Sequence, residues 1–163
     1  MKLIVAFLKL IRWPNLFFIA VTQWLFYFCV VESLKFDRTN PASYSHSHNA
    51  LFYLLMLASV LIAAAGYIIN DYFDLQIDAV NKPDKMVVDK SVKRRWAIIW
   101  HLILSAVGVL MSLYISYKTG IWVIAIANII CVFLLWFYST TFKKKLLSGN
   151  VIISALTAWT IVV

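Results

Sequence analysis

The sequence predicts an all-α protein that crosses a membrane several times. Hydrophobic residues make up 63% of the 163 positions and charged residues only 13%, with a mean hydropathy of +0.85. A soluble domain of this length could not hide that much apolar surface in one core. Long apolar runs recur along the chain, while Gly and Pro are scarce. We therefore expect one continuous transmembrane helical bundle.

Four apolar runs are each close to the roughly 20 residues that span about 30 Å of hydrocarbon. They are Leu16 to Val31, Leu51 to Ile69, Ala97 to Tyr117 and Ile121 to Tyr138. The first is longer than the apolar part of a secretory signal and lacks a small-residue cleavage site after it, so we expect a retained helix. A fifth run begins at Val151 and reaches only Val163, which indicates the N-terminal part of a longer protein.

The basic residues predict how the chain is oriented. With four complete spans, 12 of the 15 Lys and Arg residues fall on the side that holds the N-terminus and residues 71–95. By the positive-inside bias this side is cytoplasmic, and we expect the cell (inner) membrane. Topology and anionic lipid then account for the net charge of +8. The sequence holds no nucleic-acid motif, and we expect no nucleic-acid partner.

Acidic residues gather where the second run ends, and this stretch holds five of the seven. At about 100° per residue, Asp71, Asp74 and Asp78 fall within an arc of roughly 60° if the helix continues, with Asn70 beside them. Three carboxylates that face one point repel each other unless a cation compensates. Oxygen ligands without Cys or His favour Mg²⁺, which shares its coordination shell with water and a substrate's phosphates.

Two lysines, Lys82 and Lys85, follow the aspartates within one or two helical turns of sequence. Cations beside a metal-binding carboxylate face are what an anionic, phosphate-bearing ligand needs. A solvated juxtamembrane loop, in which the aspartates cap helices and pair with the lysines, is the alternative. The spacing alone leaves both interpretations open.

The segment NDYFDLQID (70–78) resembles the first aspartate-rich motif, NDxxDxxxD, of the UbiA superfamily of intramembrane prenyltransferases. The continuation NKPDK (81–85) is similar to the N-[RK]-P-D-[RK] of the archaeal-lipid branch, the geranylgeranylglyceryl phosphate geranylgeranyltransferases. IRWPNL (11–16) and LWFYSTTFKKKLLSGN (135–150) resemble further family segments, so the resemblance covers nearly the whole chain. KMVVDK (85–90) departs from the family's usual Arg-Pro-[Leu/Ile]-Pro, and the second aspartate-rich motif is absent.

This resemblance implies that residues 1–163 are the truncated N-terminal part of one transmembrane prenyltransferase domain. They would supply the first four to five of about nine helices around a central cavity. Mg²⁺ would bind the diphosphate of a polyprenyl donor, and a lipophilic or glycerol-phosphate acceptor would capture the allylic carbocation. Because the second motif is missing, we expect residues 1–163 alone to be inactive.

The resemblance also assigns residues to roles. The catalytic carboxylates would be Asp71, Asp74 and Asp78, which with Asn70 would hold the metal. The substrate-binding residues would be Asn70, Lys82, Lys85, Tyr138, Ser139, Lys143 and Arg12. Arg12 and Lys143 also fit plain positive-inside anchors, and Tyr138 fits an interfacial aromatic belt.

Other functions stay open from the sequence. The acceptor could be an aromatic quinone precursor such as 4-hydroxybenzoate or dihydroxynaphthoate. A different class is a non-catalytic membrane interaction subunit. A third is a cation transporter, which predicts charged residues deep within the spans, and the four complete runs contain no Asp, Glu, Lys or Arg.

Overall fold

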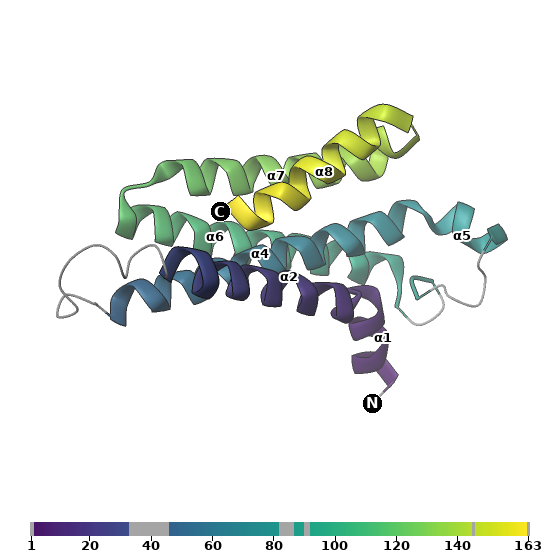
Figure 1. Ribbon diagram of the computed structural model, residues 1–163. Helices are drawn as coiled ribbons and strands as arrows, with labels where there is room; N and C mark the ends of the chain where they lie inside the picture. The colour runs from purple at the N-terminus through teal and green to yellow at the C-terminus, as the bar shows by residue number, and fades with distance from the viewer. Residues whose placement is uncertain (1, 33–45, 82–86, 90–91, 145, 163) are drawn as a thin grey trace.

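The computed structural model describes residues 2–32, 46–81, 87–89, 92–144 and 146–162, which form a helical bundle (Figure 1). The helices are α1 (Lys2–Leu10), α2 (Trp13–Phe26), α4 (His46–Phe73), α5 (Leu75–Asn81), α6 (Arg94–Thr119), α7 (Trp122–Thr140) and α8 (Leu146–Val162). A π-helical segment η1 (Tyr27–Glu32) continues α2, and a 3₁₀ turn η4 (Phe142–Lys144) follows α7. The described residues contain no strand, only an isolated bridge between Val88 and Val92. The all-α prediction is confirmed.

Four helices of the described chain are long and apolar enough to cross a membrane. They are Trp13–Val31, Ala50–Phe73, Arg94–Thr119 and Trp122–Thr140. Each matches one of the four predicted runs, with bounds that differ by a few residues. The fifth run is also helical, although α8 begins at Leu146 rather than Val151. The chain is therefore an integral membrane protein.

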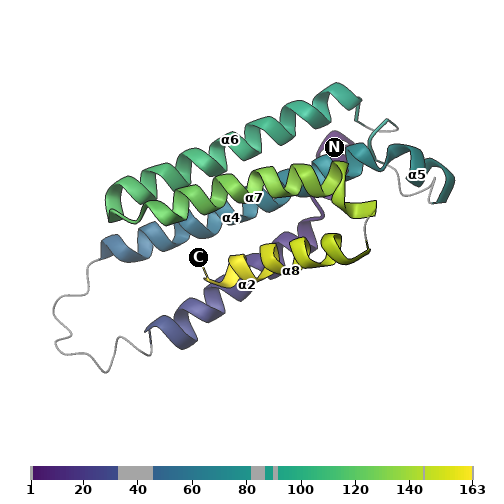
Figure 2. The same cartoon turned by 90° about the horizontal axis from the view of Figure 1, so that it is seen from above.

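Helix α4 lies at the centre of the bundle, where it packs against α2, α6 and α7 (Figure 2). Small residues allow this close approach. A Cβ added to Gly108 of α6 would lie 2.7 Å from Ile62 Cγ1, and one added to Gly66 of α4 would lie 2.8 Å from Leu135 Cδ2. Membrane helices associate through such van der Waals contact, because lipid tails are as apolar as the side chains they replace.

Hydrogen bonds from polar side chains connect α7 to α6 and hold α8 to α7 and α2. Asn128 Nδ2 of α7 donates to Ser112 Oγ of α6 at 2.7 Å, and Trp159 Nε1 of α8 donates to Asn128 Oδ1 at 2.9 Å. Gln23 Nε2 of α2 donates to the Thr160 carbonyl oxygen at 2.7 Å. Polar groups in hydrocarbon need such partners, so these bonds fix which helix faces meet.

A tight turn joins α6 to α7. Gly120 has a φ of +75° and its N–H donates to the Ser116 carbonyl oxygen at 2.8 Å, which ends α6. This left-handed conformation is open to glycine at no steric cost. The two helices therefore form an antiparallel hairpin, with Lys118 near its tip.

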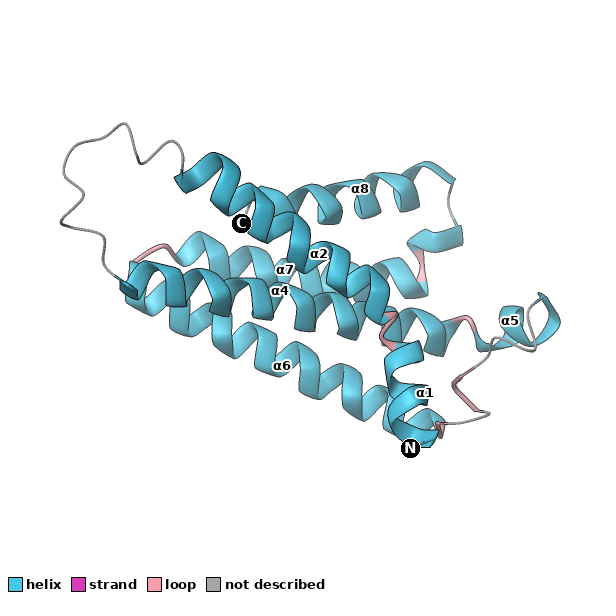
Figure 3. Ribbon diagram, turned by 60° about the horizontal axis from the view of Figure 1, so that its bottom comes forward, coloured by secondary structure: helices cyan, strands magenta, loops and turns pink. Residues whose placement is uncertain are grey.

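Helix α1 was not predicted, and it runs across the direction of the other helices (Figures 1 and 3). It ends at Leu10 because Pro14 has no N–H to donate to the Leu10 carbonyl oxygen. The chain turns at Ile11 and Arg12, where Arg12 has a left-handed φ of 52°. The α1 segment is too short to span a membrane, so a search for spanning runs passes over it.

Candidate functional site

The aspartate motif lies at the end of α4, where the helix is interrupted and resumes. Helix α4 ends at Phe73, Asp74 occupies a turn, and α5 begins at Leu75. The Asp74 N–H still donates to the Asn70 carbonyl oxygen at 3.0 Å, and the Asp78 N–H to the Asp74 carbonyl oxygen at 2.8 Å. The backbone thus keeps a helical hydrogen-bond pattern through the motif, with a local break at Asp74.

The Asp74 carboxylate is buried and lies in a small polar cluster. Its Oδ2 forms an ion pair with Lys143 Nζ of η4 and accepts a hydrogen bond from Asn70 Nδ2 at 3.1 Å. Lys143 Nζ also donates to Asn70 Oδ1 at 3.1 Å. One ammonium group from a distant part of the chain therefore contacts two residues of the motif.

Asp71 is paired with Arg12, which is another of the basic residues that the sequence singled out. Arg12 Nη2 donates to Asp71 Oδ1 at 2.7 Å, and the Arg12 guanidinium lies 5.2 Å from the centroid of the Tyr67 ring. The turn between α1 and α2 thus places Arg12 against α4. Tyr67 was missed from the sequence, although its position one turn before Asp71 puts it on the same helix face.

The structure contradicts the expectation that Asp71, Asp74 and Asp78 face one point. Within the described ranges, no group of three or more His, Cys, Asp or Glu side chains lies close enough to hold one metal ion. The physical reason is that Asp71 and Asp74 are each paired with a different basic residue, Arg12 and Lys143. Asp78 has no ion pair with any described residue.

The donor atoms nevertheless fit Mg²⁺ by their chemistry. Mg²⁺ usually takes only one or two protein carboxylates and completes its shell with water and phosphate oxygens, so convergence of three is not required. The ion pairs engage Asp71 Oδ1 and Asp74 Oδ2, and each carboxylate has a second oxygen. Asn70 adds an amide oxygen. All of these are hard oxygen ligands, the type that Mg²⁺ prefers.

A cavity of about 360 Å³ lies between the helices next to this cluster. Four predicted site residues line it: Arg12, Asn70, Tyr138 and Ser139. Its walls continue through Ile62, Gly66, Leu135, Ile153 and Leu156, and it reaches Ser59, Asn128 and Trp159. Asn70 and Ser59 are separated by 11 residues of α4, or about 16 Å of helix. The cavity therefore has a charged end, an apolar middle and an uncharged polar end.

Asn128 and Trp159, at the uncharged end, were missed from the sequence. Asn128 is a single amide in an apolar run and Trp159 is one aromatic residue of α8, and neither pattern gives a signal of a cavity. Lys82 and Lys85, which were predicted to bind phosphate, lie outside the described residues.

Electrostatics explains why basic groups gather here. The C-terminal end of a helix carries a partial negative charge, to which the carboxylates of the motif add their own. Arg12 and Lys143 come from separate parts of the chain, and their ion pairs with the motif reduce this charge. An anion that binds at this end would need further positive charge, which a divalent cation on the aspartates would add.

Comparisons with known proteins bear on this geometry. Residues 40–163 match the sequence profile of the UbiA prenyltransferase family. Digeranylgeranylglyceryl phosphate synthase of Methanosarcina barkeri is 35% identical over 157 residues, which cover 93% of this chain and 51% of that protein. The enzyme of the same name from Sulfolobus acidocaldarius is 32% identical over 157 residues, covering 94% of this chain and 50% of that protein.

A solved structure of digeranylgeranylglyceryl phosphate synthase in membranes has the same fold. It superposes with a TM-score of 0.79 at 25% sequence identity and covers 99% of this chain and 52% of its own. The chain spans about half the length of the curated relatives it matches.

Proposed function

Because this chain belongs to the UbiA prenyltransferase family, we propose that its protein transfers a prenyl group from an allylic prenyl diphosphate to a lipophilic or glycerol-phosphate acceptor. Residues 1–163 would form part of a single transmembrane domain and supply its first aspartate-rich motif. One observation carries the proposal: Arg12 and Lys143 meet Asn70, Asp71 and Asp74 beside a largely apolar cavity. The names of the relatives support a glycerol-phosphate acceptor over an aromatic one.

The donor's diphosphate would bind at the charged end of the cavity. Arg12 and Lys143 already contact the motif, so a short side-chain movement suffices for each to donate to phosphate oxygens. Lys82 and Lys85 would add two more cations. Charge-assisted hydrogen bonds from fixed cations stabilise the negative charge that the leaving diphosphate gains as the allylic C–O bond breaks.

The metal would be held by one or two of the carboxylates of Asp71, Asp74 and Asp78, together with the amide oxygen of Asn70. When bound, Mg²⁺ supplies positive charge that stabilises the departing diphosphate. Asp71 and Asp74 have a second role, because their ion pairs hold Arg12 and Lys143 beside the motif.

The cavity walls would protect the reactive allylic cation from water. Ile62, Leu135 and Leu156 give the middle of the cavity an apolar lining that fits an isoprenoid chain. Tyr138 and Ser139 lie at its charged end, where their hydroxyl groups would orient the donor or the acceptor. Ser139 Oγ donates to the Leu135 carbonyl oxygen at 2.9 Å, so this hydroxyl is directed by its own helix.

Substitution of the aspartates in the full-length protein tests the proposal. Transfer from labelled geranylgeranyl diphosphate with Mg²⁺ would be measured for Asp74→Asn and Asp78→Asn, with geranylgeranylglyceryl phosphate or 4-hydroxybenzoate as the acceptor. Loss of one carboxylate should lower kcat/KM by about a hundredfold, as for other groups that stabilise transition-state charge. We expect product only with the glycerol-phosphate acceptor.

Asp89→Asn is the matched control. Asp89 is exposed, lies outside the motif and pairs with Arg94, so its substitution should leave transfer unchanged. Transfer that persists in Asp74→Asn and Asp78→Asn would instead favour a transport protein or a non-catalytic interaction subunit.

A further inference from the structure

We propose that the groove between α1 and the first turns of α6 binds a hydrocarbon chain of an anionic bilayer lipid, whose headgroup contacts the basic residues at the start of α6. This site is separate from the aspartate cluster. The proposal does not depend on prenyl transfer.

The faces of α1 are those of a helix that lies in the membrane interface. Ala6 and Leu10 are buried against the bundle, whereas Ile4 and Leu8 are exposed. Lys9 is exposed as well and is two residues, or about 200° around the helix, from Phe7. A helix that runs across the spans, with apolar residues on one side and a lysine on the other, fits the boundary between headgroups and acyl chains.

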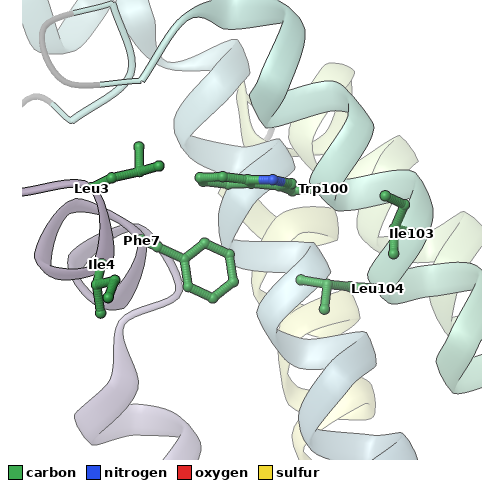
Figure 4. A pocket seen from close by; sticks show the side chains of 6 residues that line it. All are labelled: Leu3, Ile4, Phe7, Trp100, Ile103 and Leu104. Carbon is green, nitrogen blue, oxygen red and sulfur yellow. The ribbon is translucent and has the colours of Figure 1, made fainter. Parts of the chain in front are cut away.

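The groove itself is lined only by apolar side chains, as Figure 4 shows. It has a volume of about 330 Å³ and is bounded by Leu3, Ile4 and Phe7 of α1 and by Trp100, Ile103 and Leu104 of α6. The Phe7 and Trp100 rings meet edge to face, with centroids 4.7 Å apart, and connect the two helices. Apart from the indole N–H of Trp100, the described residues that line the groove have no side-chain hydrogen-bonding group, so it suits a hydrocarbon chain.

The distance of the groove from the start of α6 places it at the level of the lipid tails. At 1.5 Å per residue, Trp100 lies about 9 Å and Leu104 about 15 Å from Arg94, the first residue of α6. The groove therefore begins below the level at which the span starts. Trp96 lies one turn before Trp100 on the same face and is exposed, as expected for an aromatic residue at headgroup level.

Charge decides which lipid fits. The sequences of α1 and α6 contain no acidic residue. Lys93, which immediately precedes α6, and Arg95 in its first turn are exposed, and neither has an ion pair among the described residues. Each basic group near a membrane surface attracts anionic lipid. A lipid with a phosphate-bearing anionic headgroup therefore fits this site, because its headgroup matches Lys93 and Arg95 and its acyl chain matches the apolar groove.

Native mass spectrometry of the full-length protein tests this binding without any turnover. The detergent-solubilised protein is titrated with phosphatidylglycerol and, separately, with phosphatidylcholine that carries the same acyl chains. We expect a tighter first binding step for phosphatidylglycerol. Ile103→Trp, which fills the groove from an exposed position, should weaken that step by roughly tenfold. The double substitution Lys93→Gln with Arg95→Gln should weaken it by about fivefold per cation removed.

Two matched variants control for general effects. Ile126→Trp places the same indole at an equally exposed site on α7, since Ile103 is 54% and Ile126 is 56% exposed. Lys118→Gln removes a cation from the opposite end of α6. Both should bind phosphatidylglycerol like the wild type, and circular dichroism would verify that every variant retains its helices.

Three results would overturn the proposal. One is equal affinity for the two lipids. Another is an equal loss of phosphatidylglycerol affinity in Ile103→Trp and Ile126→Trp. The third is displacement of phosphatidylglycerol by geranylgeranyl diphosphate, which would assign the groove to the prenyl donor. All three results are measurements of lipid binding and do not require transferase activity. A failure of this proposal can therefore be told apart from a failure of the proposed function.

Discussion

Two contacts define the candidate site at the level of single residues, and both join distant parts of the chain. Arg12 and Asp71 are 59 residues apart, and Lys143 and Asp74 are 69 residues apart. The residue types were predicted, but these pairings were not. Arg12 and Lys143 each belong to a basic cluster that the positive-inside bias explains without any binding site. Only the fold shows which basic residue meets which carboxylate.

Replacement of Lys143 should separate its site role from a general charge effect. Lys143→Gln removes an ammonium group that contacts Asp74 and Asn70, so it should lower kcat/KM for prenyl transfer by about a hundredfold. Lys143→Arg keeps the charge and should retain part of the activity. Kinetics of the full-length protein with labelled prenyl diphosphate would measure both.

Lys118→Gln removes the same charge far from the site and should have no effect on transfer. If Lys143→Gln behaved like Lys118→Gln, Lys143 would be only a positive-inside anchor.

At the level of elements, hydrophobicity predicted the four spans well because each is a long apolar run. It could not predict α1, whose nine residues are too few to span a membrane. It also missed the break at Asp74, since no Gly or Pro marks the end of α4. The two ion pairs, which engage Asp71 and Asp74 with different basic residues, account for the failure of the expected three-carboxylate convergence.

The contact between α7 and α8 leads to a prediction about stability. Asn128→Leu would leave Trp159 Nε1 and Ser112 Oγ without their shared partner, at a cost of about 1 kcal/mol of unfolding free energy. Trp159→Phe removes the same indole bond from the other side. The loss of unfolding free energy in the double variant should therefore be clearly smaller than the sum of the losses in the two single variants.

Unfolding of the full-length protein in mixed micelles would measure this coupling. Thr157→Val serves as a control on α8, because within the described part of the chain the Thr157 hydroxyl donates only to the Ile153 carbonyl oxygen of its own helix. Additive losses for Asn128→Leu and Trp159→Phe would show that the hydrogen bond contributes nothing to the packing of α8.

At the level of the whole molecule, one end of the bundle brings together the candidate site and most of the described basic residues. The turn after α1, the end of α4, the start of α6 and η4 all lie there, as the helix directions in Figure 1 show. The sequence predicted that these segments lie on the same side of the membrane, because it contains four complete spans. We propose that it faces the cytoplasm.

Thiol labelling of intact cells tests that orientation. In a full-length variant with every native cysteine, Cys29 and Cys131 included, replaced by Ala, a cysteine would be placed at Val80 of α5 or at Tyr117 of α6. Both positions are highly exposed, at 81% and 74%, and they lie at opposite ends of the bundle. A membrane-impermeant maleimide should label Tyr117→Cys in intact cells and Val80→Cys only after permeabilisation. The reverse pattern would invert the topology.

The glycine turn between α6 and α7 has a consequence for biosynthesis. Between Arg95 and Lys143, Lys118 is the sole acidic or basic residue in the sequence, His101 aside. In the proposed orientation, translocation of the hairpin tip carries a single ammonium group through the hydrocarbon, at a cost of about 3 kcal/mol on insertion scales. Two apolar helices closed by Gly120 outweigh that cost, so the translocon can release them into lipid as one pair.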